Sequence, residues 1–139
     1  LQEALAPTDE GAPRSVLVVD DEPDIRGFLE QVLSYHGYGV RTAADGQAAL
    51  AQVGVEHPDL ILLDLKMPGV DGYEVIRRLK AEEDTRPIPI IVITASPVDK
   101  ERDKVRVLGM GATQYLAKPF SIKTLIDEIK KTVVERPSQ

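Results

Sequence analysis

The sequence predicts an α/β protein built on a parallel sheet, and three observations support this. Short apolar runs that suit buried strands alternate with segments in which apolar residues recur at helical spacing. Several of these runs are continuously apolar, as in strands covered on both faces. Five strand–helix units follow one another in 139 residues, and repeated units of this kind form one sheet with helices on both sides.

The predicted strands differ in strength. Residues 16–19, 59–64 and 90–93 contain continuous runs of Leu, Ile and Val, which predict central strands. Residues 39–42 form a weaker candidate, and residues 115–117 form the last one. Each of these segments is followed by a helical pattern, so we expect every strand to run in the same direction.

The helices are predicted from apolar spacing and from residues that start or stop helices. The predicted segments run from Pro23 to just before Gly37, and then over 45–53, 73–83, 98–108 and 122–133. Pro23 suits a first helical turn, Gly37 suits a helix end, and Ser121 can cap the last helix. The charged residues from Asp99 to Arg106 are expected to form a solvated helix face.

Composition excludes several classes of function. The net charge of −6 and the pI near 4.9 predict no direct nucleic-acid binding by this segment, because such binding needs a basic surface. The absence of cysteine excludes disulfides, thiolate metal sites and thiol catalysis. No apolar stretch approaches the ~20 residues that span a bilayer.

The two ends of the chain differ from the middle in composition. Residues 1–14 are rich in Ala, Pro and acids and lack the pattern of a signal peptide, so we expect a linker or flexible arm. Residues 135–139 are expected to be a tail, which leaves 15–134 as the folded domain. The first residue is not Met, which is consistent with a piece of a longer protein.

Polar residues follow the predicted strands at their carboxyl ends. Asp20 and Asp21 follow the first strand, Asp64 ends the third, Thr94 ends the fourth and Lys118 follows the fifth. Ligands of open parallel sheets bind outside these ends. The sequence therefore predicts a pocket with three carboxylates, a hydroxyl and an ammonium.

This set of groups suits a divalent cation and a phosphoryl group. Three neighbouring carboxylates raise one another's pKa unless a cation intervenes. Mg²⁺ prefers oxygen ligands, whereas zinc would need His or Cys. With the ion bound, one carboxylate can attack phosphorus, while Lys118, the Thr94 hydroxyl and the backbone N–H groups of Lys66 and Ala95 stabilise the phosphoryl oxygens.

Four motifs together identify a family that the chain resembles. They are Val18-Val19-Asp20-Asp21-Glu22, Leu63-Asp64-Leu65-Lys66-Met67-Pro68-Gly69, Ile93-Thr94-Ala95 and Tyr115-Leu116-Ala117-Lys118-Pro119-Phe120. From about residue 15 to residue 134 the chain resembles the receiver domain of two-component response regulators. The resemblance implies a flavodoxin-like (βα)5 domain with strand order 2-1-3-4-5.

The resemblance also implies roles for individual residues. Asp64 resembles the phospho-acceptor, and Lys118 resembles the lysine that pairs with it and then with phosphate. Asp21, Asp64 and the backbone carbonyl of Lys66 are implied to bind Mg²⁺ directly, and Asp20 through water. Thr94 resembles the switch hydroxyl. In the same family an aromatic switch stands at Tyr115, and the peptide before Pro119 is usually cis.

The implied function is a cytoplasmic switch in signal transduction, not a turnover enzyme. Its partner would be a histidine kinase or a histidine phosphotransfer protein, and a homodimer is a further option. Two alternative functions stay open. One is a degenerate receiver that binds partners without phosphorylation. The other is an Asp-nucleophile phosphohydrolase, which would place its second acid two residues after the nucleophile of the first strand, where this chain has Glu22 after Asp20.

Overall fold

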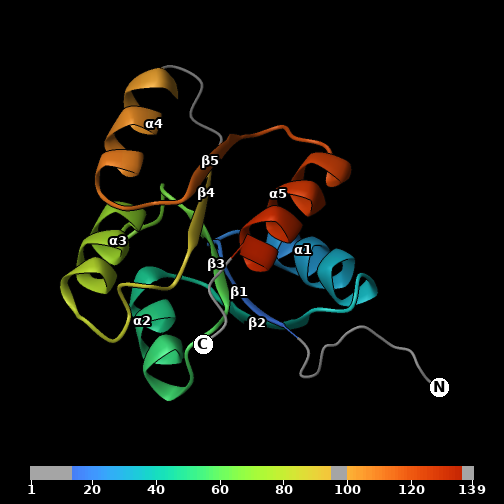
Figure 1. Ribbon diagram of the computed structural model, residues 1–139, viewed down its shortest axis with the longest axis horizontal. Helices are drawn as coiled ribbons and strands as arrows, with labels where there is room; N and C mark the ends of the chain where they lie inside the picture. Colours follow the sequence, from blue (N-terminus) through green and yellow to red (C-terminus); the bar gives the residue numbers. More distant parts are fainter. Residues whose placement is uncertain (1–13, 95–99, 136–139) are drawn as a thin grey trace.

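The computed structural model describes residues 14–94 and 100–135. Within these ranges, five strands alternate with five helices along the chain (Figure 1). The strands are β1 (Ser15–Val19), β2 (Gly39–Ala43), β3 (Leu60–Asp64), β4 (Ile90–Thr94) and β5 (Gln114–Ala117). The helices are α1 (Pro23–Tyr35), α2 (Gly46–Val55), α3 (Gly72–Ala81), α4 (Lys100–Gly109) and α5 (Ile122–Glu135).

The five strands form one parallel sheet in the order β2-β1-β3-β4-β5. This confirms the predicted flavodoxin-like architecture. Strands β3 and β4 are buried along their whole length, which explains why both read as continuous apolar runs. Because all strands are parallel, their carboxyl ends lie along the same edge of the sheet.

Alternate strand residues face two hydrophobic layers. On one face, α1 and α5 cover the sheet, and on the other α2, α3 and α4 cover it (Figure 1). In β1, Val16 and Val18 pack against the α1 and α5 layer, whereas Leu17 and Val19 pack against the other helices. The period of two along a strand places these neighbours on opposite faces. Burial of both layers is the main stabilising contribution to this fold.

Hydrogen bonds at the ends of the helices explain where they begin and end. The Asp45 side chain accepts a bond from the N–H of Ala48, and that of Asp71 from the N–H of Glu74, so α2 and α3 are each capped by an aspartate. Helix α3 ends at Ala81, two residues before its predicted end. Its last carbonyls are bound instead by Thr85 and Arg86 from the following turn.

Parts of the sequence prediction fall outside the described residues. Of the predicted arm, only Arg14 is described, and of the predicted tail, only Glu135. Ala95 and the first two residues of the predicted 98–108 helix also lie outside the described residues. Within the described part of the chain, no helix is both long and apolar enough to cross a bilayer.

Candidate functional site

Three carboxylates meet at the carboxyl edge of the sheet. Asp20 and Asp21 follow β1, and Asp64 is the last residue of β3. Strands β1 and β3 are neighbours with Val19 paired to Leu63, so the next residue on each strand brings Asp20 beside Asp64. One oxygen from each of the three carboxylates lies within 4.8 Å of the others. The predicted acidic cluster is therefore confirmed.

Asp20 is the most deeply buried of the three acids and the most fully bonded. Its side chain is 0% exposed. Its Oδ1 accepts a 2.9 Å bond from the N–H of Glu22, and its Oδ2 accepts a 3.2 Å bond from Lys118 Nζ. Arg26 in α1 donates to the Asp20 carbonyl oxygen at 2.8 Å. These bonds fix the β1–α1 turn that also carries Asp21, the most solvent-accessible acid of the cluster.

Lys118 follows β5, an edge strand of the sheet, and its side chain extends toward the cluster. Its backbone N–H donates to the Thr94 carbonyl at 2.7 Å, which ties the end of β5 to the end of β4. The resemblance implied that Lys118 pairs with Asp64, but in the structure its ion pair is with Asp20. Both carboxylates are buried, and the one with no exposed surface, Asp20, has the ion pair. Lys118 acts on Asp64 through its charge, which lowers the pKa of that carboxyl.

The surroundings of Asp64 favour its protonated form. Burial is the largest cause, followed by the negative charge of Asp20, and together they raise the pKa of Asp64 from 3.8 to about 6. Lys118 and the N–H of Lys66, which lies 3.3 Å from Asp64 Oδ1, oppose this rise. At neutral pH the carboxylate is therefore ionised but poorly stabilised, so a bound cation would stabilise its charge strongly.

Two glycines let the loop after β3 pack closely against its neighbours. A Cβ on Gly72 would lie 2.6 Å from Leu65 Cα and 2.7 Å from the Asp64 carbonyl oxygen. A Cβ on Gly46, at the start of α2, would overlap the carbonyl of Val70 in the same loop. Sequence analysis did not identify these glycines as part of the site. Both glycines are the first residue of a helix, and this position could have drawn attention to them. The sequence does not show which backbone atoms lie next to a glycine.

The remaining predicted residues occupy different depths of the sheet. Thr94 is the last residue of β4 and is 1% exposed. It pairs in register with Ala117, the residue before Lys118. Tyr115 in β5 is 7% exposed, so its ring lies inside the protein. The backbone of Lys66 lies beside Asp64 as predicted, whereas Ala95 lies outside the described residues.

Comparison with known proteins identifies the family. The model of the response regulator receiver domain matches residues 16–130. The chain belongs to this family. The motifs that suggested the family in the sequence are thus the ones that build the acidic pocket, and the receiver is a signalling module rather than an enzyme that turns over external substrates.

Two relatives are about twice as long as the region that they share with this chain. The chain is 47% identical over 117 residues to a probable transcriptional regulator, ycf27, of Cyanophora paradoxa, and 45% identical over 118 residues to a protein of the same name from Porphyridium aerugineum. The matches cover 84% and 85% of this chain. They span 47% of each relative, so the chain corresponds to about half the length of these proteins.

Solved structures share the fold. A putative response regulator from Chloroflexus aurantiacus J-10-fl has a TM-score of 0.83 and 35% identity, with 89% of this chain and 100% of that one covered. The signal receiver domain of a histidine kinase from Syntrophus aciditrophicus has a TM-score of 0.79 and 33% identity, with 91% and 96% covered. Receivers of both kinds of signalling protein therefore resemble this chain.

One sequence expectation about the receiver is wrong. The charges of α4 were expected to face solvent, but Asp103 is only 7% exposed. It points between α3 and α4, where Oδ1 accepts a 2.6 Å bond from the Tyr73 hydroxyl. A buried acid on a highly charged helix has no distinct sequence signal, because its partner lies thirty residues away on another helix.

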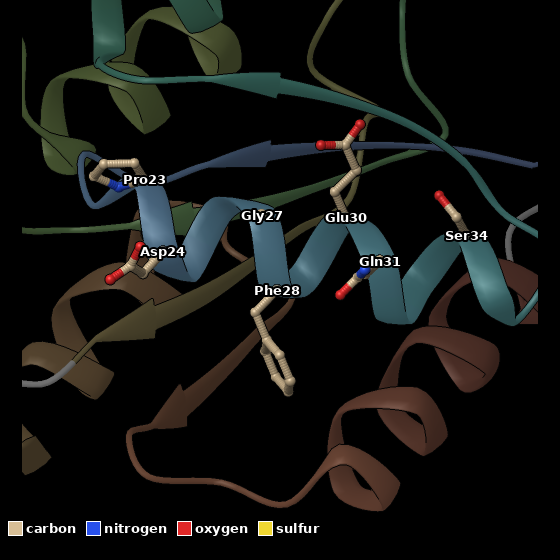
Figure 2. Close-up of a pocket in the computed structure, with 7 residues that line it drawn as sticks. All are labelled: Pro23, Asp24, Gly27, Phe28, Glu30, Gln31 and Ser34. Atoms are coloured by element: carbon tan, nitrogen blue, oxygen red, sulfur yellow. The ribbon is translucent and has the colours of Figure 1, made fainter.

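An open groove runs along the outer side of α1. Its lining includes Pro23, Asp24, Phe28, Gln31 and Ser34. Figure 2 shows the Phe28 ring projecting from the helix, with Asp24 and Gln31 on either side of it. Phe28 is 51% exposed, so the groove offers an aromatic ring to solvent. Helix α1 begins two residues after Asp21, so the groove extends from the edge of the acidic pocket.

Proposed function

We propose that this receiver is a phosphorylation switch in which Asp64 accepts a phosphoryl group from a phosphohistidine in a Mg²⁺-dependent step. The observation that carries the proposal is the meeting of three carboxylates and Lys118 at one edge of the sheet. The raised pKa of Asp64 supports it, because strongly perturbed carboxyls concentrate at functional sites.

The residues present suit Mg²⁺. The cluster offers oxygen donors, and among the described residues it includes neither His nor Cys. Asp21, Asp64 and the Lys66 carbonyl would bind the ion directly, and Asp20, already bonded to Lys118, would do so through water. The bound ion would neutralise charge on the phosphoryl oxygens and allow Asp64 to approach phosphorus.

The transfer uses one oxygen of the Asp64 carboxylate as nucleophile. A bond forms between this oxygen and phosphorus, the N–P bond of phosphohistidine breaks, and the electron pair of that bond stays on the imidazole. Lys118 stabilises the charge on the transferred group, and so do the backbone N–H groups of Lys66 and Ala95. Hydrolysis of the resulting acyl phosphate resets the switch.

The new group changes the charge balance at the edge of the sheet. The phosphoryl group carries about −1.5 to −2 charges and replaces the single charge of the Asp64 carboxylate, so the site becomes more negative by about one charge at most. Thr94 at the end of β4 donates its hydroxyl to the phosphoryl group, and Tyr115 fills the space that Thr94 leaves. The loops around α4 and β5 then shift, so phosphorylation biases an equilibrium between two conformations.

The donor is a histidine kinase or a phosphotransfer protein that docks on the α1 groove. Its histidine must reach Asp64 past Asp21, the most open side of the pocket, and the groove with Phe28 begins there. A homodimer through α4 is a second association, supported by Val105 and Leu108, which are 69% and 38% exposed. If the whole protein regulates transcription, DNA contacts would come from outside the receiver because the net charge is −6.

Acyl phosphate formation tests the proposal directly. The chain is incubated with acetyl phosphate with and without Mg²⁺, and the product is measured by intact mass and by Phos-tag electrophoresis. We expect one added phosphoryl group that requires Mg²⁺ and is removed by hydroxylamine. Asp64→Asn should abolish it, whereas Asp84→Asn, the matched change at an exposed acid, should not. Labelling that survives Asp64→Asn contradicts the assignment, and no labelling of the unmodified chain favours a degenerate receiver.

A further inference from the structure

A polar cluster joins α3 and α4 on the face of the sheet opposite α1. The Tyr73 hydroxyl of α3 donates to Asp103 of α4 at 2.6 Å, and the Arg106 guanidinium lies 3.8 Å from the centre of the Tyr73 ring. We call Tyr73, Asp103 and Arg106 the α3–α4 clasp. Burial of the ring, the hydrogen bond to Asp103 and the charge of Asp103 raise the pKa of Tyr73 to about 12, so its hydroxyl keeps the proton that makes the bond.

Two buried polar atoms beside the clasp lack a partner. Within the described residues, neither Asp103 Oδ2 nor the Tyr115 hydroxyl forms a hydrogen bond. The Asp103 oxygen can accept a hydrogen bond, and the Tyr115 hydroxyl can donate one. Burial raises the pKa of the Tyr115 hydroxyl, and the negative charge of Asp103 raises it further. Buried groups left unpaired are costly and rare in folded proteins, so a state in which these two bond would be favoured.

The clasp is connected to the phosphorylation site through two chain segments. Tyr73 directly follows Gly72, whose Cα packs against Asp64 and Leu65 without room for a Cβ. Tyr115 is in β5, three residues before Lys118. The two tyrosines that interact with Asp103 are therefore each within three residues of a residue that belongs to the site or packs against it.

We propose that Asp103 is the positioning residue of the switch: its Oδ2 accepts a hydrogen bond from the Tyr115 hydroxyl in the phosphorylated state, while Oδ1 keeps the bond from Tyr73. The carboxylate then ties α3 and β5 to α4 at one point. In the structure, the Tyr73 bond is present, and Asp103 Oδ2 and the Tyr115 hydroxyl do not bond to each other. This inference rests on the proposed function, because it names how the phosphoryl signal reaches α4.

A double-mutant cycle tests the new bond. The unmodified chain, Asp103→Ala, Tyr115→Phe and the double variant are titrated with beryllofluoride at saturating Mg²⁺, and the concentration at half-saturation is measured. Each single change should raise it about ten- to hundredfold, as expected for loss of a hydrogen bond to a charged group, and the double change should raise it no further. Tyr35→Phe is the control, because that ring is 87% exposed and should have no effect.

A second measurement uses Asp103→Asn, which keeps the shape of the side chain and removes its charge. With 3-fluorotyrosine incorporated, the ¹⁹F signal of Tyr115 is assigned by its loss in Tyr115→Phe, and it should move on addition of beryllofluoride. In Asp103→Asn the signal should move to a different position, because an amide replaces the charged acceptor. Additive effects in the cycle, or the same ¹⁹F shift with and without the carboxylate, overturn the inference. A chain that shows no Asp64-dependent response to beryllofluoride contradicts the proposed function as well.

Discussion

Lys118 Nζ lies 3.2 Å from Asp20 Oδ2, and this ion pair joins the end of β5 to the end of β1 across two intervening strands. It is the longest-range side-chain bond of the site, between residues 98 positions apart. Because Asp20 is fully buried and Lys118 is 17% exposed, the pair is shielded from solvent. It holds an acid and an ammonium ready at the place where a phosphoryl group would arrive.

Removal of Lys118 should destabilise the metal-free receiver. Lys118→Met leaves the buried Asp20 carboxylate without its counter-charge, and breaking a buried pair in this way costs about 3 kcal/mol. Urea denaturation at pH 7.5 without divalent cations measures the free energy of unfolding. The double change Lys118→Met with Asp20→Asn should recover most of the loss, because no charge is then left unpaired. Equal stability of Lys118→Met and the unmodified chain would show that the pair contributes nothing.

Replacement of Asp64 should stabilise the fold by an amount that depends on pH, because the pKa of this carboxyl is raised. A carboxyl whose pKa rises from 3.8 to about 6 on folding binds protons more tightly in the folded state, so it destabilises the fold as pH rises through this window. Asp64→Asn should therefore raise the free energy of unfolding by about 3 kcal/mol at pH 7.5 and by little at pH 4. Denaturation curves of both proteins at the two pH values measure this, and a difference independent of pH would refute it.

Mg²⁺ should stabilise the receiver through the same carboxylates. At a concentration ten times its dissociation constant, a ligand that binds only the folded state adds about 1.4 kcal/mol. Thermal or urea unfolding at pH 7.5 with increasing MgCl2 measures the effect. We expect it to be lost in Asp21→Asn and kept in Asp84→Asn, which also removes one negative charge. An equal response of both variants would indicate general screening of charge rather than a site.

Gly72 should tolerate no side chain. In Gly72→Ala the new Cβ would meet Leu65 Cα and the Asp64 carbonyl, so the acceptor loop must shift, at a cost of about 1–3 kcal/mol. Phosphorylation by acetyl phosphate should slow as well, because the Asp64 carboxylate moves with its backbone. Gly54→Ala is the matched control: it lies in α2 with nothing within 4 Å of the new Cβ and should stabilise the protein by about 0.5–1 kcal/mol.

Phe28 should affect the rate of phosphorylation by a protein donor but not by a small-molecule donor. Phe28→Ala removes the exposed ring from the α1 groove, so phosphotransfer from the cognate kinase should slow about tenfold, as for loss of an aromatic interface anchor. The rate with acetyl phosphate should stay unchanged, because Phe28 is not among the three clustered carboxylates. Parallel assays with the two donors measure the difference. A loss with both donors would point to damage of the site, and a loss with neither would exclude the groove as the docking surface.

Much of the fold could be predicted because its signals are local. Continuous apolar runs, helical spacing and the polar residues at strand ends depend on neighbours in the chain, and together they predicted the parallel sheet and the meeting of Asp20, Asp21 and Asp64. The carboxyl ends of parallel strands share one edge, so knowing the strands was enough to place these acids.

The partners of individual side chains were decided only by the tertiary structure. The strand pattern was enough to place Lys118 at the edge with the acids, but its pairing with Asp20, the acid with no exposed surface, follows from the folded structure. In the same way, the contacts of Gly46 and Gly72 and the burial of Asp103 depend on backbone and side chains far away in the sequence. Periodicity specifies which face of an element is buried, whereas distances between elements decide which groups can bond, and these distances exist only after the layers have packed.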